Sequence, residues 1–101
     1  MEMEITSYEQ FKEAIKEGDI LVDFYATWCG PCRMLGPVIA EVAEDHPDLK
    51  VLRVDVDRVG QAAANYGVSS IPTLVHIQDG KTVNQTLGFM PKASVEKFLG
   101  R

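Results

Sequence analysis

The sequence predicts an α/β fold with the element order βαβαβαββα, and three observations support this prediction. Apolar, valine-rich stretches typical of strands alternate with stretches of helical periodicity through most of the chain. The dipeptide Asp79-Gly80 lies between two further strand-like stretches and is a strong hairpin signal. A last amphipathic stretch follows the hairpin. The alternation predicts parallel strands joined by right-handed crossovers, and the hairpin predicts an antiparallel edge.

Length and composition limit what the protein can be. A chain of 101 residues can bury one hydrophobic core, so residues 1–101 are expected to form a single domain. No apolar run approaches the ~20 residues that cross a bilayer, so no membrane association is expected. The acidic start, Met1–Glu4, is unlike a basic secretory signal and predicts a cytoplasmic location. The net charge of -5, with no basic cluster, argues against a nucleic-acid partner.

The first part of the chain is predicted to hold two strands and the helix between them. A short strand is expected at Met3–Ile5. Thr6 and Ser7 each have a glutamate or glutamine three residues further on, the spacing of a capping box, so a helix should begin there. Ile20–Ala26 is nearly continuous in its apolar character, as expected of a central strand buried on both faces. Asp23 is its one charged residue.

The remaining elements follow from the same two periodicities. They are a helix with an apolar stripe over Leu35–Ala43, a strand at Lys50–Val56, a short helix at Gln61–Tyr66 with Asp57 as its N-cap, strands at Ile71–Ile77 and Thr82–Leu87, and a last helix with Pro91 in its first turn.

The only two cysteines lie in Trp28-Cys29-Gly30-Pro31-Cys32, where a predicted strand passes into a predicted helix. A disulfide over so short a spacing restricts the unfolded chain little, so reactivity explains the pair better than stabilisation does. At a helix start, the Cys29 sulfur would face unpaired N–H groups and the positive end of the helix dipole, which favour a thiolate. Cys29 is therefore the predicted nucleophile. Cys32, three residues further into the protein, is the predicted resolving thiol.

The two residues between the cysteines also suit this chemistry. Gly30 lets a bulky disulfide substrate approach the backbone, and Pro31 fixes the turn where an N–H would have no helical partner. The predicted reaction is attack of the Cys29 thiolate on a protein disulfide, followed by attack of Cys32 on the mixed disulfide. This exchange needs no cofactor. A separate reductase is expected, because the chain has no dinucleotide or flavin fingerprint.

The cysteine pair could instead be half of a metal site or an inert structural pair. Zinc prefers four ligands, and only His46 and His76 could supply nitrogen donors. Neither histidine lies at a finger-like spacing from the cysteines, so no metal is expected. The helix-start context argues against inert cysteines.

Asp23 is a candidate acid–base residue. A charge in the middle of an apolar strand is costly, so burial should raise the pKa of this carboxyl group. Such a group could take the proton from Cys32 when Cys32 must attack. The alternative is an aspartate at a strand edge that merely reaches water.

Pro72 is an awkward residue for a central strand and is acceptable mainly at its first position. Turn statistics favour an ordinary trans peptide bond between Ile71 and Pro72. A cis bond would instead turn the Ile71 backbone outward, ready to pair with an extended substrate segment.

These residues, taken together, closely resemble the thioredoxin family over essentially the whole chain. The resemblance is carried by Val22–Cys32, Pro37, Tyr66-Gly67-Val68, Ile71-Pro72-Thr73, Asp79-Gly80 and Gly88. A lone Cys-x-x-Cys would be weak support. The resemblance is specific because Trp-Cys-Gly-Pro-Cys follows the predicted strand at Ile20–Ala26 and is followed, at the family's spacing, by Ile71-Pro72-Thr73.

The resemblance implies more than the residues show by themselves. It implies a mixed five-stranded sheet flanked by four helices, with Pro72 cis and facing the dithiol. It implies general reduction of protein disulfides and recharging by thioredoxin reductase, with NADPH as the distant electron source. It also implies a substrate groove built from Trp28, Gly30, Pro31, Ile71, Pro72 and Gly88.

Two positions depart from the family pattern. Arg53 stands where many members place a lysine near the buried aspartate, and an arginine should hold Asp23 ionised more firmly because it cannot lose its proton. Phe89 is larger than the small residue often found beside Gly88. It could form part of the groove rim, or simply pack against the last helix.

Two rival functions remain at the level of sequence. An oxidase or isomerase would use the same exchange chemistry, but those proteins work in oxidising compartments and usually have other residues between the cysteines. A binding subunit would use the exposed apolar groove to hold a partner without turnover.

The protein is expected to be a monomer.

Overall fold

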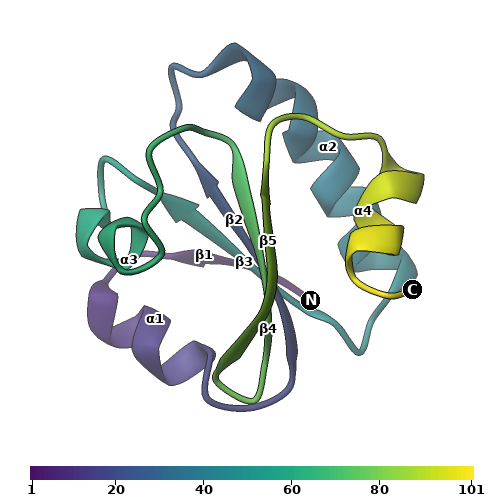
Figure 1. Cartoon of the computed structure of the whole chain (residues 1–101), viewed down its shortest axis with the longest axis horizontal. Coiled ribbons are helices and arrows are strands. Elements are labelled where there is room, and N and C mark those ends of the chain that lie inside the picture. Colours follow the sequence, from purple (N-terminus) through teal and green to yellow (C-terminus); the bar gives the residue numbers. More distant parts are fainter.

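The computed structural model describes residues 1–101 and has the predicted element order (Figure 1). The strands are β1 (Glu2–Ile5), β2 (Asp19–Tyr25), β3 (Lys50–Asp55), β4 (Thr73–Gln78) and β5 (Lys81–Leu87), and the helices are α1 (Tyr8–Ala14), α2 (Gly30–Asp45), α3 (Gly60–Asn65) and α4 (Lys92–Phe98). The predicted boundaries agree with these to within a few residues.

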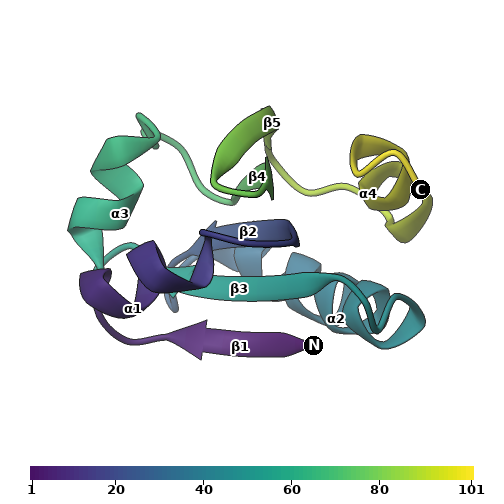
Figure 2. The ribbon, with the colours of Figure 1, turned by 90° about the horizontal axis from the view of Figure 1, so that it is seen from below.

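The five strands form one mixed sheet in the order β1-β3-β2-β4-β5. Figure 2 shows this order from β1 at one edge to β5 at the other. β1, β3 and β2 are parallel, whereas β4 is antiparallel to both β2 and β5. The predicted combination of parallel crossovers and an antiparallel edge hairpin is confirmed. Within the sheet, Asp23 of β2 lies opposite Arg53 of β3.

Two pairs of helices cover the two faces of the sheet. α1 and α3 lie on one face, and α2 and α4 on the other (Figure 1). Alternating side chains of the strands supply both faces, because successive residues of a strand point to opposite sides. Phe11, Phe24 and Tyr66 pack together in the first layer, with ring centroids 5.8 to 6.2 Å apart. Leu35, Ile39 and Val42 of α2 are buried in the second layer.

The ends of the elements show which local predictions hold. Ser7 caps α1 by accepting a hydrogen bond from the Gln10 N–H at 3.1 Å, and the Gln10 side chain accepts one from the Thr6 N–H at 2.7 Å. The bond to Ser7 is the N-cap half of the predicted capping box, whereas the Gln10 side chain reaches back to Thr6 rather than to the N–H of Ser7 itself. The predicted role of Asp57 is wrong, because the N-cap of α3 is Val59 and no side chain caps that helix.

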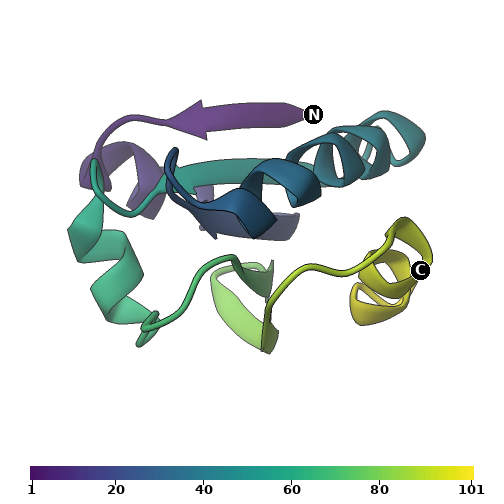
Figure 3. The same cartoon turned by 90° about the horizontal axis from the view of Figure 1, so that it is seen from above.

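The hairpin between β4 and β5 turns at Asp79 and Gly80, with φ values of 49° and 83°. Both residues in the left-handed region match a two-residue turn of the type that follows the twist of the strands. At the other end of the sheet, the start of α2 lies near the segments that precede β4 and follow β5 (Figure 3). None of the four helices is long and apolar enough to cross a membrane.

Candidate active site

Cys29 and Cys32 lie at the junction of β2 and α2 and are joined by a disulfide bond. Cys29 is the N-cap of α2, and its sulfur accepts a hydrogen bond from the Cys32 N–H at 3.2 Å. Pro31 occupies the first turn, where no helical N–H is lost. N–H groups and the positive end of a helix dipole at Cys29 stabilise negative charge on sulfur. The predicted helix-start position of the pair is confirmed.

Both cysteines are buried, and they differ slightly in residual exposure. Cys29 is 6% exposed and Cys32 is 2% exposed, so Cys29 is the outer residue. A Cβ atom added at Gly30 would contact no other part of the protein. The space in front of this backbone is therefore open to an approaching molecule.

The loop before β4 closes one side of the disulfide. The Ile71–Pro72 peptide bond is cis, as the family resemblance implied, and the trans bond favoured by turn statistics is wrong here. The Cys29 sulfur lies 3.8 Å from the Ile71 carbonyl oxygen. Gly88 lies beside this loop, because its N–H donates to the Pro72 carbonyl at 2.8 Å. The structure thus brings Ile71, Pro72 and Gly88 together next to Cys29.

Two large aromatic side chains named in the sequence are exposed. Trp28 is 67% exposed, and its indole N–H donates to an Asp57 carboxylate oxygen at 2.8 Å. Asp57 therefore binds Trp28 and does not cap α3. Phe89 is 44% exposed, whereas its neighbour Met90 packs against the core between α2 and α4. Phe89 is therefore available at the surface, whereas Met90 is not.

Asp23 is buried beneath this region, with 1% of its surface exposed. Arg53 donates from Nε to one carboxylate oxygen at 3.0 Å, and the other oxygen, Oδ1, has no hydrogen-bond partner. Burial raises the pKa of Asp23 to about 6, although the Arg53 charge and hydrogen bond lower it. Glu2 and Glu4 raise this pKa slightly further. The expected raised pKa is confirmed, and the alternative of a water-exposed aspartate is wrong.

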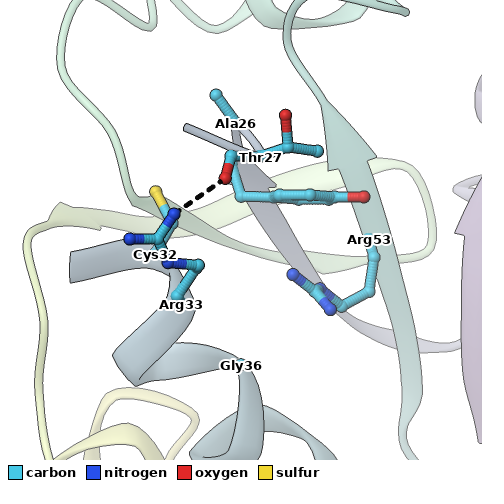
Figure 4. Close-up of a pocket in the computed structure, with 7 residues that line it drawn as sticks. Ala26, Thr27, Cys32, Arg33, Gly36 and Arg53 are labelled. Carbon is cyan, nitrogen blue, oxygen red and sulfur yellow. Dashed lines mark hydrogen bonds between the residues drawn. The ribbon is translucent and has the colours of Figure 1, made fainter. Parts of the chain in front are cut away.

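A pocket of about 340 Å³ opens between α2 and β3 beside the buried sulfur (Figure 4). Cys32 and Arg53 both line it, and Arg33 at its rim donates to the Thr27 carbonyl at 3.3 Å. Tyr25, which sequence analysis did not single out, also lines this pocket. The Arg53 guanidinium lies 4.2 Å from the centre of the Tyr25 ring. Only the register of β2 on β3 could have revealed this stacking.

The two histidines considered as metal ligands have other partners. His76 hydrogen-bonds Asp19 at the start of β2, and His46 hydrogen-bonds Glu96 of α4. No group of three or more histidine, cysteine, aspartate or glutamate side chains is arranged to hold a metal ion.

The fold and this geometry define the class of protein as a thiol–disulfide oxidoreductase. A disulfide over three residues adds little stability, whereas its position at a helix start beside an open surface suits exchange with another disulfide.

Comparisons with known proteins identify the family. A family model for thioredoxin matches residues 2–101. Thioredoxin of Chlamydia trachomatis is 41% identical over 99 residues, which cover 98% of this chain and 97% of that protein. Thioredoxin of Bacillus subtilis is 40% identical over 94 residues, covering 92% and 90%. The X-ray structure of Fasciola hepatica thioredoxin superposes with a TM-score of 0.90 at 35% identity, covering 97% of this chain and 96% of that one.

The chain belongs to the thioredoxin family. It is a dithiol–disulfide reductase, and membership implies client proteins that carry disulfides and a reductase that restores the dithiol. The rival function of a binding subunit without turnover is therefore not supported.

Proposed function

We propose that the chain is a general protein-disulfide reductase in which Cys29 is the nucleophile and Cys32 the resolving thiol. The observation that supports this order is the N-cap position of Cys29, where the Cys32 N–H points at the Cys29 sulfur at 3.2 Å. The same hydrogen bond would stabilise a Cys29 thiolate in the reduced protein. Cys32, one turn further in, receives no such contact.

The proposed reaction transfers two electrons to the client in two exchanges. The Cys29 thiolate attacks one client sulfur, the client S–S bond breaks, and the second client sulfur leaves as a thiolate. Cys32 then loses its proton and attacks the Cys29 sulfur, which breaks the mixed disulfide and releases the other client thiolate. The client is reduced, and the Cys29–Cys32 dithiol is oxidised to the disulfide. We propose that thioredoxin reductase, with NADPH as the distant electron source, restores the dithiol, and that no bound cofactor or metal takes part.

The client would bind along the surface around Cys29. Trp28, Gly30 and Pro31 would form one wall of this groove. Ile71, Pro72 and Gly88, which lie together beside the Cys29 sulfur, would form the other wall and offer backbone groups to an extended client segment. The exposed Phe89 would extend the apolar rim.

Asp23 would accept the Cys32 proton during the second exchange. A carboxyl group with a pKa of about 6 is mostly ionised at neutral pH, yet it binds a proton more readily than an ordinary aspartate. The positive charge of Arg53 would favour the ionised form of Asp23 before the proton is transferred from Cys32. Gly30 and Pro31 would tune the pair by setting the geometry of the turn that holds both sulfurs.

The setting of this activity is also a proposal. We infer that residues 1–101 act as one domain and as a monomer in the cytoplasm. A local pair of cysteines, with no further disulfide, suits a reducing compartment in which the dithiol form can be regenerated.

The order of the two thiols can be tested with single substitutions and a disulfide-bonded client. Cys32→Ser should accumulate a stable mixed disulfide with the client on Cys29, because no second thiol can release it. Cys29→Ser should form no such adduct and should show no reduction above the uncatalysed rate, measured by mass spectrometry and thiol release. Trapping on Cys32 in the Cys29→Ser variant at an equal rate would refute the assignment.

The role of Asp23 can be tested separately. Asp23→Asn should form the mixed disulfide at a rate close to that of the unaltered protein but release the product about tenfold or more slowly near pH 7, because general-base assistance is lost. Stopped-flow measurement of the two phases separates them. Unchanged resolution kinetics would remove Asp23 from the mechanism.

A further inference from the structure

Arg53 lies between a buried carboxylate and an open pocket. Its Nε donates to Asp23 at 3.0 Å, and this is the only hydrogen bond that its side chain makes. Its two terminal nitrogens have no hydrogen-bond partner, and the side chain also lines the pocket of about 340 Å³ beside Cys32 (Figure 4). The guanidinium therefore has room to leave Asp23 and enter the pocket, where water could solvate it.

Tyr25 restrains this movement. It follows Asp23 by two residues on β2, so the two side chains lie on the same face of the sheet. The Tyr25 ring lies 4.2 Å below the Arg53 guanidinium, and its hydroxyl donates to a Glu4 carboxylate oxygen at 2.7 Å. An aromatic face attracts a cation, so the ring favours the position of the guanidinium beside Asp23.

The charges around Asp23 make this restraint consequential. Arg53 of β3 is its only ion-pair partner, whereas two like charges on β1, those of Glu2 and Glu4, raise its pKa. On α2, Cys32 lines the same pocket as Arg53. Arg33, at the rim of the pocket, donates a hydrogen bond to the Thr27 carbonyl. No second cation forms an ion pair with Asp23.

We propose that Tyr25 is a positioning residue that holds Arg53 against Asp23 and thereby sets the pH range in which Cys32 resolves the mixed disulfide. This inference rests on the proposed role of Asp23. When the ring is present, the guanidinium stays on the carboxylate and favours its ionised form. When the ring is removed, Arg53 divides its time between Asp23 and the pocket, and Asp23 retains its proton to a higher pH.

The experiment compares Tyr25→Leu, which removes the ring, with Tyr25→Phe, which keeps the ring and loses only the hydroxyl. Carboxyl-carbon NMR titration of the reduced proteins reports the pKa of Asp23. Tyr25→Leu should raise it by roughly half a pH unit, about threefold in proton affinity, whereas Tyr25→Phe should leave it near its original value. The pH midpoint of mixed-disulfide resolution should move upward by the same amount.

The same pair of substitutions in an Arg53→Gln background separates positioning from burial. Removing the ring also changes the hydration of Asp23, so only the part of the pKa shift that depends on Arg53 supports the proposal. In the Arg53→Gln background, Tyr25→Leu should therefore cause no further rise in the pKa of Asp23. The proposal would be overturned if Tyr25→Leu shifted the pKa of Asp23 equally in both backgrounds or in neither. It would also be overturned if Tyr25→Leu and Tyr25→Phe had equal effects. Tyr25→Ile offers a β-branched substitute if the leucine variant does not fold.

The outcomes also distinguish this inference from the proposed function. If Asp23→Asn resolves the mixed disulfide at the original rate, the proposed role of Asp23 fails. The NMR shift would still show whether Tyr25 acts on Asp23 through Arg53. If Asp23→Asn is slow and the coupling is absent, only the positioning role of Tyr25 fails.

Discussion

The two aspartates of β2 lie four residues apart on the strand and have opposite electrostatic outcomes. Asp19 begins the strand and Asp23 lies four residues further along, on the same face of the sheet. Burial raises the pKa of both carboxyl groups. At Asp23 burial prevails and the pKa rises to about 6, whereas at Asp19 the hydrogen bonds prevail and the pKa falls below its usual range.

The depth of burial and the number of donors together explain the difference. Asp19 lies 2.5 Å from His76 Nε2 on one oxygen and 2.9 Å from Arg101 on the other, and Gln78 lowers its pKa further. Asp23 is more deeply buried and receives one hydrogen bond, from Arg53, while its Oδ1 has none. A fully satisfied carboxylate stabilises a fold, and one left partly unsatisfied retains affinity for a proton. The partly unsatisfied carboxylate is the one that lies nearer the cysteines along the strand.

The largest expected effect is on the pH dependence of stability in Asp23→Asn. The folded protein binds a proton at Asp23 more tightly than the unfolded chain, whose pKa is near 3.8, so ionisation destabilises the fold as pH rises from about 4 to above 6. The variant lacks this penalty. Its free energy of unfolding, relative to the unaltered protein, should increase by about 3 kcal/mol between pH 3.5 and pH 7.5 in denaturant titrations.

Asp19→Asn is the matched control, and its sign is reversed. The pKa of Asp19 is lowered, so its ionised form stabilises the fold at neutral pH, and this contribution is lost as pH falls below about 3.8. The variant should be less stable at pH 7, and the deficit should shrink in acid. If the difference in stability from the unaltered protein did not depend on pH for either variant, the contrast drawn between Asp19 and Asp23 would be wrong.

A smaller effect is expected when one of the hydrogen-bond donors to Asp19 is removed. Arg101 contacts both Asp19 and Asp48, so Arg101→Gln should raise the pKa of Asp19 and cost about 1 kcal/mol of stability at pH 7. Carboxyl NMR and denaturant titrations measure the two quantities. Lys97→Gln removes an equal charge from α4 that makes no ion pair and should change neither. An unaltered Asp19 pKa in Arg101→Gln would show that Arg101 is not needed there.

The smallest effect is expected for Arg53→Lys. A lysine keeps the positive charge but loses the planar group that both stacks on Tyr25 and donates from Nε to Asp23. The pKa of Asp23 should rise by a few tenths of a unit in a carboxyl NMR titration. No change at all would count against the importance of the Arg53–Asp23 pair.

Local signals in the sequence were sufficient for the elements and for the reactive pair. Periodicity located every strand and helix, the capping box at Ser7 marked the start of α1, and Asp79-Gly80 marked the hairpin. The position of Cys29 at the start of α2 followed from the passage of an apolar strand into a helical pattern. Each of these features depends on residues within a few positions of one another, which is why sequence alone determined them.

The tertiary structure decided what depends on residues far apart in the chain. It paired Trp28 with Asp57, which the sequence had placed as a helix cap, and it placed the Tyr25 ring under Arg53. It also made Asp19 a satisfied carboxylate and Asp23 a partly unsatisfied one, although both are aspartates on the same strand. Strand register and burial determine these contacts, and both arise only when the sheet and its helices pack together.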